Sequence, residues 1–321
     1  MSRKTVVPVF FTADERYAPY LSTALVSLIE HTSKKYTYEI NVIYHDMSFR
    51  SLRKLKRLGN GYDNVKLIFT EMKDTLEGIS DRKSTRLKAD CFTPTIYYRI
   101  FLPEMFPQYD KGLYLDSDII VNDDVAKLFE TDLKGNLIAA CVDMSTQGNP
   151  LFCKYFDDAV GIQHDRYFNS GVLVIDFEKF REEEFCEHFL YLLNKYDFDT
   201  VAPDQDYLNA MCVGRVKYLD IAWNAMPTPD HHPMKDPKIV HYNLFFKPWH
   251  YDGTDYEELF WEYAKHSAFY KTIEKEKKTF SKKSVKGDEE RLAQMTERVK
   301  EILKAEVTFK KIFESGQETR N

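Results

Sequence analysis

Short runs of apolar residues, rich in Val, Ile, Tyr and Phe, recur along the chain and are separated by polar or charged stretches. Runs of this kind, bounded by polar residues, are typical of strands that are buried on both faces of a sheet. We therefore predict β-strands at residues 6–11, 39–45, 65–70, 112–116, 136–143, 171–177 and 238–242.

Between the first three runs, apolar residues recur at helical spacing. One stripe, with intervals of three and four, consists of Leu21, Ala24, Leu25 and Leu28. A second stripe follows Ser48, a residue type that caps helix N-termini, and consists of Phe49, Leu52, Leu55 and Leu58. Strands that alternate with helices predict a parallel, doubly wound sheet of the α/β class. Such sheets bind ligands at the carboxyl ends of their strands, so residues 10–17 and 114–118 are the first places to look for chemistry.

The pattern changes after residue 270. Residues 271–286 hold seven lysines against two glutamates and few apolar residues, which is typical of a linker or a solvated basic stretch. Such a stretch either keeps the surface soluble or contacts an anionic membrane face. The chain is therefore predicted to consist of a domain at residues 1–268 and an appendage, a basic linker and a helix, at residues 269–321.

The helix of this appendage is predicted to begin at Gly287 and Asp288, with acidic residues at its amino end and lysines near its carboxyl end. Its apolar stripe consists of Leu292, Met295, Val299, Ile302, Phe309 and Phe313. An apolar stripe must pack on something, and the sequence leaves two alternatives open. Either the helix folds back on the domain, or it associates with a second copy or a partner helix.

Composition narrows the class of protein. The chain has 321 residues, of which 43% are hydrophobic, enough for one large α/β domain with an appendage. Its net charge of -6 speaks against a general nucleic-acid binder, since contacts to phosphate backbones need an excess of Lys and Arg. The N-terminal apolar stretch is interrupted by Pro8, and no window reaches the about 18 apolar residues of a membrane span. We expect neither secretion nor membrane spanning.

The cysteines indicate a reducing compartment. The chain has five, without a CxxC pair: Cys91, Cys141, Cys153, Cys186 and Cys212. An odd number of scattered cysteines fits buried thiols better than a disulfide framework. The expected location is the cytoplasm, and the basic stretch allows peripheral contact with the inner face of the membrane.

Two aspartates, Asp116 and Asp118, follow the fourth predicted strand in the segment GLYLDSDIIVNDD. Residues two apart on a strand point the same way, so these carboxylates repel unless a positive charge lies between them. Three interpretations are open: ligands of Mg²⁺ or Mn²⁺ that grip a phosphate, the nucleophile and acid/base pair of an aspartate phosphatase, or two exposed turn residues. An EF-hand is excluded, because Val121 occupies the position at which that loop needs glycine.

Residues elsewhere offer partners for this pair. The segment VHYNLFFKPWH carries His241, whose imidazole favours Mn²⁺ over Mg²⁺, and Lys247, a point charge suited to a diphosphate. The segment APDQDYLN puts Asp204 and Gln205 in the first turn of a predicted helix. The segment RYFNSGVLVIDF puts Asn169, Ser170 and Gly171 directly before a buried strand, a place where amides can bind hydroxyls.

Five segments, in order and spacing, resemble glycosyltransferase family 8. They are FFTADERYAPYLSTALVSL, YYRIFLPEMFPQYDKGLYLDSDIIVNDDVAKLFETDL, YFNSGVLVIDFEKF, PDQDYLNA and VHYNLFFKPWH, and the likeness runs from about residue 5 to residue 265. The family includes bacterial lipopolysaccharide galactosyl- and glucosyltransferases, plant galacturonosyltransferases, glycogenin and transferases similar to general stress protein A. The resemblance implies a GT-A fold, which is Rossmann-like, with a mixed, mainly parallel sheet flanked by helices. It also implies a retaining, Mn²⁺-dependent transferase with a UDP-sugar donor.

The same resemblance implies roles for single residues. Asp116, Asp118 and His241 would hold Mn²⁺, with Mg²⁺ as an alternative, against the two phosphates of UDP. The catalytic residues at the sugar would be Asp204 and Gln205. The donor would contact Thr12, Asp14, Tyr17, Arg99, Ser117, Asp143, Asn169, Leu244 and Lys247.

Within this donor set, Tyr17 is expected to stack on uracil and Asp14 to accept a hydrogen bond from its polar edge. Two positions depart from the family pattern. Arg16 stands where relatives often have asparagine, and Leu244 stands where many have a glycine whose backbone approaches the phosphate. We expect diphosphate binding to survive with a somewhat different backbone geometry at Leu244.

Retention of configuration would ordinarily suggest a double displacement through a carboxylate nucleophile. Gln205 occupies the position expected beneath the sugar, and an amide is a poor nucleophile. We therefore expect a front-face route, in which the acceptor hydroxyl attacks from the side of the leaving group and the departing phosphate oxygen takes its proton. Asp204 would bind sugar hydroxyls and offset the oxocarbenium charge, and a direct nucleophilic role for it stays open.

The predicted function is transfer of glucose or galactose from UDP-glucose or UDP-galactose to a glycan, glycolipid or glycoprotein of the cell envelope. Two rivals are an aspartate-type phosphohydrolase that uses Asp116 and Asp118, and a sugar-binding module without activity. The phosphohydrolase lacks a convincing later lysine and acidic pair. A module without activity would not explain why His241, Asp204 and Lys247 occur together.

Overall fold

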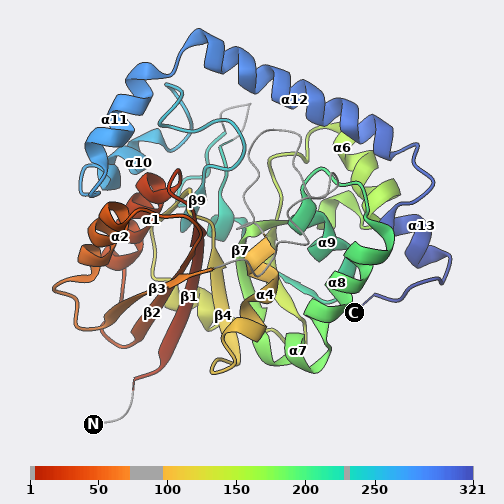
Figure 1. Cartoon of the computed structure of the whole chain (residues 1–321), viewed down its shortest axis with the longest axis horizontal. Helices are drawn as coiled ribbons and strands as arrows, with labels where there is room; N and C mark the ends of the chain where they lie inside the picture. Colours follow the sequence, from red (N-terminus) through yellow and green to blue (C-terminus); the bar gives the residue numbers. More distant parts are fainter. Residues whose placement is uncertain (1–3, 73–96, 228–231, 321) are drawn as a thin grey trace.

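The computed structural model describes residues 4–72, 97–227 and 232–320 and centres on a seven-stranded sheet of order β3-β2-β1-β4-β7-β6-β8 (Figure 1). A smaller sheet pairs β5 with β9. The strands are β1 Val6–Ala13, β2 Thr37–Tyr44, β3 Val65–Glu71, β4 Lys111–Leu115, β5 Ile119–Val121, β6 Ile138–Val142, β7 Phe168–Asp176, β8 Val216–Tyr218 and β9 Ile239–His241. Each predicted strand is confirmed, and the short β5 and β8 were not predicted.

Helices cover both faces of the large sheet (Figure 1). The α-helices are α1 Ala18–Glu30, α2 Phe49–Lys56, α4 Tyr98–Met105, α5 Ala126–Phe129, α6 Pro150–Tyr155, α7 Phe177–Glu182, α8 Phe185–Tyr196, α9 Pro203–Met211, α10 Glu257–Ala264, α11 Tyr270–Thr279, α12 Lys282–Ile302 and α13 Phe309–Glu314. Short 3₁₀ or π turns are η1 Arg57–Gly59, η4 Phe156–Val160, η5 His164–Arg166 and η6 Ile221–Asn224.

The large sheet is mixed and mainly parallel, as predicted. Strand β1 pairs in parallel with β2 and β4, β2 with β3, and β6 with β8, whereas β7 runs antiparallel to both β4 and β6. The carboxyl ends of β1, β4 and β6 and the amino end of β7 therefore meet at one edge. Side chains alternate between the two faces, so Val9, Leu113 and Val174 join one core cluster and Phe10, Tyr114 and Leu173 join the other.

The first helices form where the apolar stripes predict them. Ser48 caps α2, and its side chain accepts a hydrogen bond from the backbone N–H of Ser51. The buried face of α2 carries Ser51 and Leu55, four residues apart. Phe49 lies two residues before Ser51, on the opposite side of the helix, and is 80% exposed. The prediction that Phe49 belongs to the buried stripe is therefore wrong.

Most of the basic stretch is helical, and Phe280 and Ser281 separate its two helices. Helix α11 covers residues 270–279, and α12 begins at Lys282, before the predicted start at Gly287. Ser281 caps α12 by accepting a hydrogen bond from the backbone N–H of Ser284. Figure 1 shows α12 running across the molecule from α11 to the neighbourhood of α6 and α13.

The apolar stripe of this segment packs back on the rest of the chain. Met295, Val299 and Ile302 of α12, with Phe309 and Phe313 of α13, are buried in the core cluster that contains Phe198 and Tyr207. Leu292 is the exception, with 46% exposure. Of the two alternatives that the sequence leaves open, the structure supports folding back. The division of the chain at residue 268 stays a prediction.

Replacing Phe309 by alanine should lower the free energy of unfolding by about 3–5 kcal/mol, the usual cost of deleting a buried aromatic ring. The ring of Phe309 lies 4.1 Å from that of Phe198 and 4.8 Å from that of Tyr207, measured between centroids. Urea denaturation measures the change. The matched control, Leu292→Ala on the exposed side of α12, should stay within about 0.5 kcal/mol of the parent. Equal stability of the two variants would contradict packing of α13 on the core.

Two features relate to the predicted location of the protein: the state of its cysteines and the hydrophobicity of its helices. Cys141, Cys186 and Cys212 are buried and free, Cys153 is free and partly buried, and Cys91 lies outside the described residues. Within the described ranges, no helix combines the length and the apolar character that crossing a membrane requires.

Candidate active site

A cavity of about 240 Å³ opens at the edge where the strand ends meet. Most of the residues singled out in the sequence line it: Tyr17, Arg99, Asp116, Asp118, Asp143, Asn169, Asp204, Gln205, His241, Leu244 and Lys247. Of the described residues, Thr12, Asp14 and Ser117 are not in the lining. The prediction that chemistry lies at the carboxyl ends of the strands is consistent with this position.

Strand pairing brings Asp116, Asp118 and His241 together. The backbone N–H of Asp116 donates to Gly171 O at 2.8 Å, which extends the pairing of β4 with β7 by one residue. The chain then turns into β5, whose first residue lies opposite His241, and the N–H of Tyr242 donates to Asp118 O at 2.9 Å. The loop between β4 and β5 thus carries both carboxylates to the end of β9.

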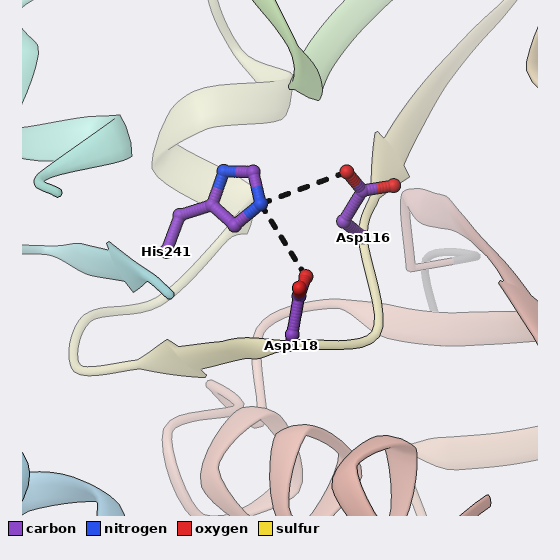
Figure 2. A group of neighbouring side chains, drawn as sticks. All are labelled: Asp116, Asp118 and His241. Atoms are coloured by element: carbon purple, nitrogen blue, oxygen red, sulfur yellow. Dashed lines mark ion pairs between the residues drawn. The ribbon is translucent and has the colours of Figure 1, made fainter. Parts of the chain in front are cut away.

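Figure 2 shows Nε2 of His241 facing both carboxylates. It lies 3.6 Å from Oδ2 of Asp116 and 3.3 Å from Oδ1 of Asp118, and the three ligand atoms are all within 4.8 Å of one another. Adjacent ligands of an octahedral ion with bonds of about 2.1 Å lie about 3 Å apart. Two carboxylates and an imidazole at these separations therefore fit a divalent cation.

Gly171 makes room for this cluster. A Cβ atom at this position would lie 2.3 Å from Cε1 of His241 and 2.6 Å from Oδ2 of Asp116. Both distances are far shorter than a non-bonded contact, so any side chain at residue 171 displaces two of the three candidate ligands.

Arg99 of α4 joins the candidate metal site to Asp204. Its guanidinium contacts Asp116 at 3.0 Å and Asp204 at 3.1 Å, and it donates to the backbone oxygen of Ser170 at 2.6 Å. Burial disfavours the charged form of Arg99, but the two carboxylates outweigh it and raise its pKa above the usual value. Burial raises the pKa of Asp204, an effect that Arg99 opposes and the charge of Asp116 reinforces.

Lys247 is the second buried cation of the site. Its Nζ lies 2.5 Å from Oδ2 of Asp118 and also donates to the backbone oxygen of Tyr242. Burial by itself would raise the pKa of Asp118, but that pKa is held below its usual value, chiefly by the charge of Lys247. Asp118 thus directs one oxygen to Lys247 and the other to His241.

A hydrogen-bonded network surrounds the other end of the cavity. Oδ2 of Asp143 accepts from Nδ2 of Asn169 at 3.0 Å and from Nε2 of Gln205 at 2.9 Å. Oε1 of Gln205 accepts from the backbone N–H of Ser170 at 2.9 Å. Both ends of the Gln205 amide are therefore held, and its orientation is fixed.

Comparison with known proteins identifies the family. The sequence model described as glycosyl transferase family 8 matches residues 8–253, well over half of the chain. The chain belongs to glycosyltransferase family 8. Both the resemblance stated from the sequence and the GT-A fold that it implies are confirmed.

Several family relatives are similar over most of the chain. A Haemophilus influenzae protein assigned as a glycosyltransferase is 28% identical over 226 residues, which cover 68% of this chain and 63% of that protein, less than two thirds of its length. General stress protein A of Bacillus subtilis is 27% identical over 269 residues, 78% of this chain and 89% of that protein. The crystal structure of the galactosyltransferase LgtC, in complex with donor and acceptor sugar analogs, has a TM-score of 0.69 at 26% identity and covers 82% of this chain and 96% of its own.

Thr12 and Ser117 do not line the cavity, but they contact residues that hold the two aspartates in place. Oγ1 of Thr12 lies 2.9 Å from the hydroxyl of Tyr114, which donates to Oδ1 of Asp116 at 2.7 Å. The hydroxyl of Ser117 donates to the backbone oxygen of Thr12 at 2.8 Å. These contacts tie the end of β1 to the loop that carries both aspartates, and the donor-binding roles of Thr12 and Ser117 stay predictions.

Asp14 lies at the end of the same strand, beside Tyr17. Its carboxylate accepts from the backbone N–H of Tyr17 at 3.0 Å and from Nε of Arg16 at 3.3 Å. Arg16, one of the two departures from the family pattern, is thus an exposed partner of Asp14. The predicted contact of Asp14 with uracil stays a prediction.

Leu244, the other departure, has a φ of 52°, in the left-handed region. Glycine adopts this conformation at least cost, whereas an L-residue with a side chain is strained there by about 1–2 kcal/mol. The loop between His241 and Lys247 therefore keeps a backbone conformation that suits glycine, although leucine occupies the position.

Two further residues contact the site without having been singled out in the sequence: Tyr114 donates to Asp116, and Asn224 contacts His241. Ser170, which the sequence places beside Asn169, contacts Arg99 and Gln205. A signal existed for Tyr114, because residues two apart on a strand share a face and Tyr114 precedes Asp116 by two. Asn224 carries no comparable signal in the sequence.

Proposed function

We propose that this chain is a retaining hexosyltransferase that moves glucose or galactose from UDP-glucose or UDP-galactose to a hydroxyl of a saccharide acceptor, with Mn²⁺ as cofactor. The acceptor is a glycan, glycolipid or glycoprotein, and cell-envelope glycan synthesis is the setting. One observation carries the proposal: the Asp116, Asp118 and His241 cluster lies in the same cavity as the Asp143, Asp204 and Gln205 network.

The two ends of the cavity suit the two parts of a nucleotide sugar. Asp116, Asp118 and His241 would hold the cation, and a mixed carboxylate and imidazole set favours Mn²⁺, with Mg²⁺ as an alternative. When bound there, the ion neutralises charge on the leaving diphosphate. Lys247, beside Asp118, is positioned to contact the same diphosphate, while Tyr17 in the lining offers its ring to uracil.

The sugar would lie against the network at the other end. Arg99 and Ser170 hold Asp204, and burial keeps the carboxylate in a medium where its charge acts strongly. Asp204 then binds sugar hydroxyls and opposes the positive charge that develops at the anomeric carbon. Because Gln205 is an amide held at both ends, a front-face route is favoured. The acceptor hydroxyl attacks the anomeric carbon as the bond to UDP breaks, and the departing phosphate oxygen takes its proton.

Release of UDP from UDP-glucose and UDP-galactose, measured without acceptor and with or without Mn²⁺, tests the function. We expect release that depends on Mn²⁺ with one of the two donors. A phosphohydrolase would instead release inorganic phosphate from an aryl phosphate, and a sugar-binding module would bind the donor without releasing UDP. Absence of both turnover and UDP binding would overturn the proposal.

Replacing Asp204 by asparagine should leave UDP binding nearly intact and lower turnover by about 100-fold to 1000-fold, the usual loss for one electrostatic group of an active site. Calorimetry with UDP and steady-state release of UDP separate the two quantities. Asp123→Asn, which removes a carboxylate paired with Lys127 away from the cavity, serves as the control. Equal losses of binding and turnover in Asp204→Asn would contradict the role of Asp204.

The cytoplasm is the proposed location, with peripheral contact at the inner face of the membrane. Lys271, Lys275 and Lys278 of α11 are exposed, which supports attraction to anionic lipid. Co-sedimentation with anionic vesicles tests this contact, and no binding at low salt would contradict it. A homo-oligomer would need a surface other than the stripe of α12, because Met295, Val299 and Ile302 are buried within the chain.

A further inference from the structure

A chain of buried hydrogen bonds leads away from His241 on the side opposite the carboxylates. Nδ1 of His241 lies 3.1 Å from Oδ1 of Asn224, and Nδ2 of Asn224 lies 3.0 Å from Oδ1 of Asn169. The same Oδ1 of Asn169 accepts from the backbone N–H of Gly171 at 2.9 Å. His241, Asn224 and Asn169 are all buried, so water does not replace these partners.

The direction of this chain is fixed at Asn169. A backbone N–H can only donate, so the atom of Asn169 that faces Gly171 must be its oxygen. At the other end of the same amide, the nitrogen of Asn169 donates to the carboxylate of Asp143. Two neighbours therefore give the same orientation, and Asn224 must turn its NH₂ group toward Asn169 and its oxygen toward His241.

This orientation decides which nitrogen of His241 carries the hydrogen. The oxygen of Asn224 only accepts, so a hydrogen lies on Nδ1, and in the neutral imidazole Nε2 then presents a lone pair to Asp116 and Asp118. The two carboxylates favour the opposite tautomer, in which Nε2–H donates to them. In that tautomer the nitrogen that a cation needs is occupied by hydrogen. The two sides of the ring therefore compete for one hydrogen.

We propose that Asn224 is a positioning residue that holds His241 in the Nδ1–H tautomer and so keeps Nε2 free to bind the metal ion. The inference rests on the metal site of the proposed function. Among the described residues that line the cavity, His241 is present and Asn224 is not, so Asn224 acts through His241 rather than on the substrate. Partners of this kind set the tautomer of metal-bound histidines, and their loss weakens metal affinity by about 10-fold to 100-fold.

The backbone makes this placement rigid. Asn224 ends η6, and the next residue, Ala225, pairs with Val240 of β9. The backbone N–H of His241 donates to Ala225 O at 2.8 Å. Asn224 and His241 are thus carried on two adjacent backbone segments that are bonded to each other, which keeps their side chains in register.

Two substitutions separate tautomer control from simple packing. Asn224→Leu removes the acceptor, so His241 should shift to the Nε2–H tautomer and Mn²⁺ affinity should fall by about 10-fold to 100-fold. Asn224→Asp keeps an acceptor for Nδ1–H but loses the donor to Asn169. It should retain the Nδ1–H tautomer and most of the Mn²⁺ affinity, even though the repulsion between its carboxylate and Oδ1 of Asn169 lowers stability.

The tautomer is read in the metal-free protein by ¹⁵N–¹H correlation of the histidine rings, at a pH where the ring ¹⁵N shifts show neutral imidazole. The His241 signal is assigned by its loss in His241→Gln. Mn²⁺ affinity is measured by electron paramagnetic resonance without donor or acceptor. Asn41→Leu is the matched control: Asn41 is equally buried and donates to Glu39 O, so this variant should lose stability without changing tautomer or affinity.

The outcomes distinguish this inference from the metal proposal. An Nε2–H tautomer of His241 in the unmodified protein would overturn the inference, and so would Asn224→Leu with unchanged tautomer and affinity. The tautomer of His241 in the unmodified protein tests the inference even if Asn224→Leu fails to fold. If the unmodified protein shows the Nδ1–H tautomer and does not bind Mn²⁺, the metal proposal fails while the tautomer assignment holds.

Discussion

Replacing Gly171 by alanine should weaken Mn²⁺ binding and lower turnover by at least about 100-fold, the usual consequence of moving active-site groups by about 1 Å. The added Cβ atom would lie 2.3 Å from the ring of His241 and 2.6 Å from the carboxylate of Asp116. Neither neighbour can yield freely, because Asn224 holds the ring and Arg99 with Tyr114 holds the carboxylate. The strain therefore falls on the candidate metal ligands themselves.

Titration with Mn²⁺ and release of UDP measure the effect of Gly171→Ala. The control is Gly287→Ala on α12, where no atom outside the neighbouring backbone of the helix lies within 4 Å of the added Cβ. Alanine in a helix interior is favoured over glycine by about 1 kcal/mol, so this control should be slightly more stable and fully active. Normal Mn²⁺ affinity in Gly171→Ala would show that the three side chains are not the metal site.

Replacing Arg99 by methionine should lower the free energy of unfolding by about 3–5 kcal/mol, because it leaves buried carboxylates without their cation. Arg99 contacts both Asp116 and Asp204 and also binds the backbone of Ser170. The loss is expected to exceed that for a surface pair such as Arg16 with Asp14, where Arg16→Met should cost less than about 1 kcal/mol. Denaturant unfolding of both variants measures the difference.

The decrease in the free energy of unfolding caused by Arg99→Met should depend on pH. The pKa of Asp204 is already raised by burial, and removal of Arg99 raises it further. The folded state then holds a proton that the unfolded state releases, so the free energy of unfolding falls as pH rises from about 4, the unfolded value, through the folded pKa. The loss should therefore be smaller at acidic pH than at neutral pH. A loss independent of pH would contradict the coupling of Arg99 to Asp204.

The strands were predictable because each is a short apolar run with polar neighbours. Strand β5 was missed because only three apolar residues of GLYLDSDIIV follow the two aspartates. The structure divides this segment at Asp116 and Asp118 and pairs the second part with β9 instead of the large sheet. Pairing partners are set by contacts far apart in sequence, and local pattern does not contain them.

The C-terminal segment shows a second limit of local pattern. Lysine is a good helix former, so a lysine-rich stretch is compatible with a helix when a few apolar residues reach the core. Ile273 supplies such a contact for α11, where it is buried with Trp249 and Phe260. A single apolar residue among lysines gives little periodicity, so local pattern does not reveal this helix.

Most of the candidate site followed from residue types that carry charge or bind metals, together with the family resemblance. Residues that act by hydrogen bonding alone were harder to find. Asn224 looks like any turn asparagine, and only its distance from His241 reveals a role. Asp206 shows the opposite, because its place in sequence beside Gln205 and near Asp204 suggests a role in the site. It lies on another side of α9 and accepts from the hydroxyls of Tyr155 and Tyr167 instead.

The packing of α12 and α13 has a consequence for the order in which the protein acquires its structure during synthesis. Chains fold from the N-terminus as they leave the ribosome. Strands β1 to β3 and helices α1 and α2 are all made within the first 71 residues, and the partners of β2 are available at once. The cluster around Phe198 and Tyr207 instead waits for Met295, Val299 and Phe309. One wall of the cavity includes Met295, so that wall can form only after residue 295 has been made.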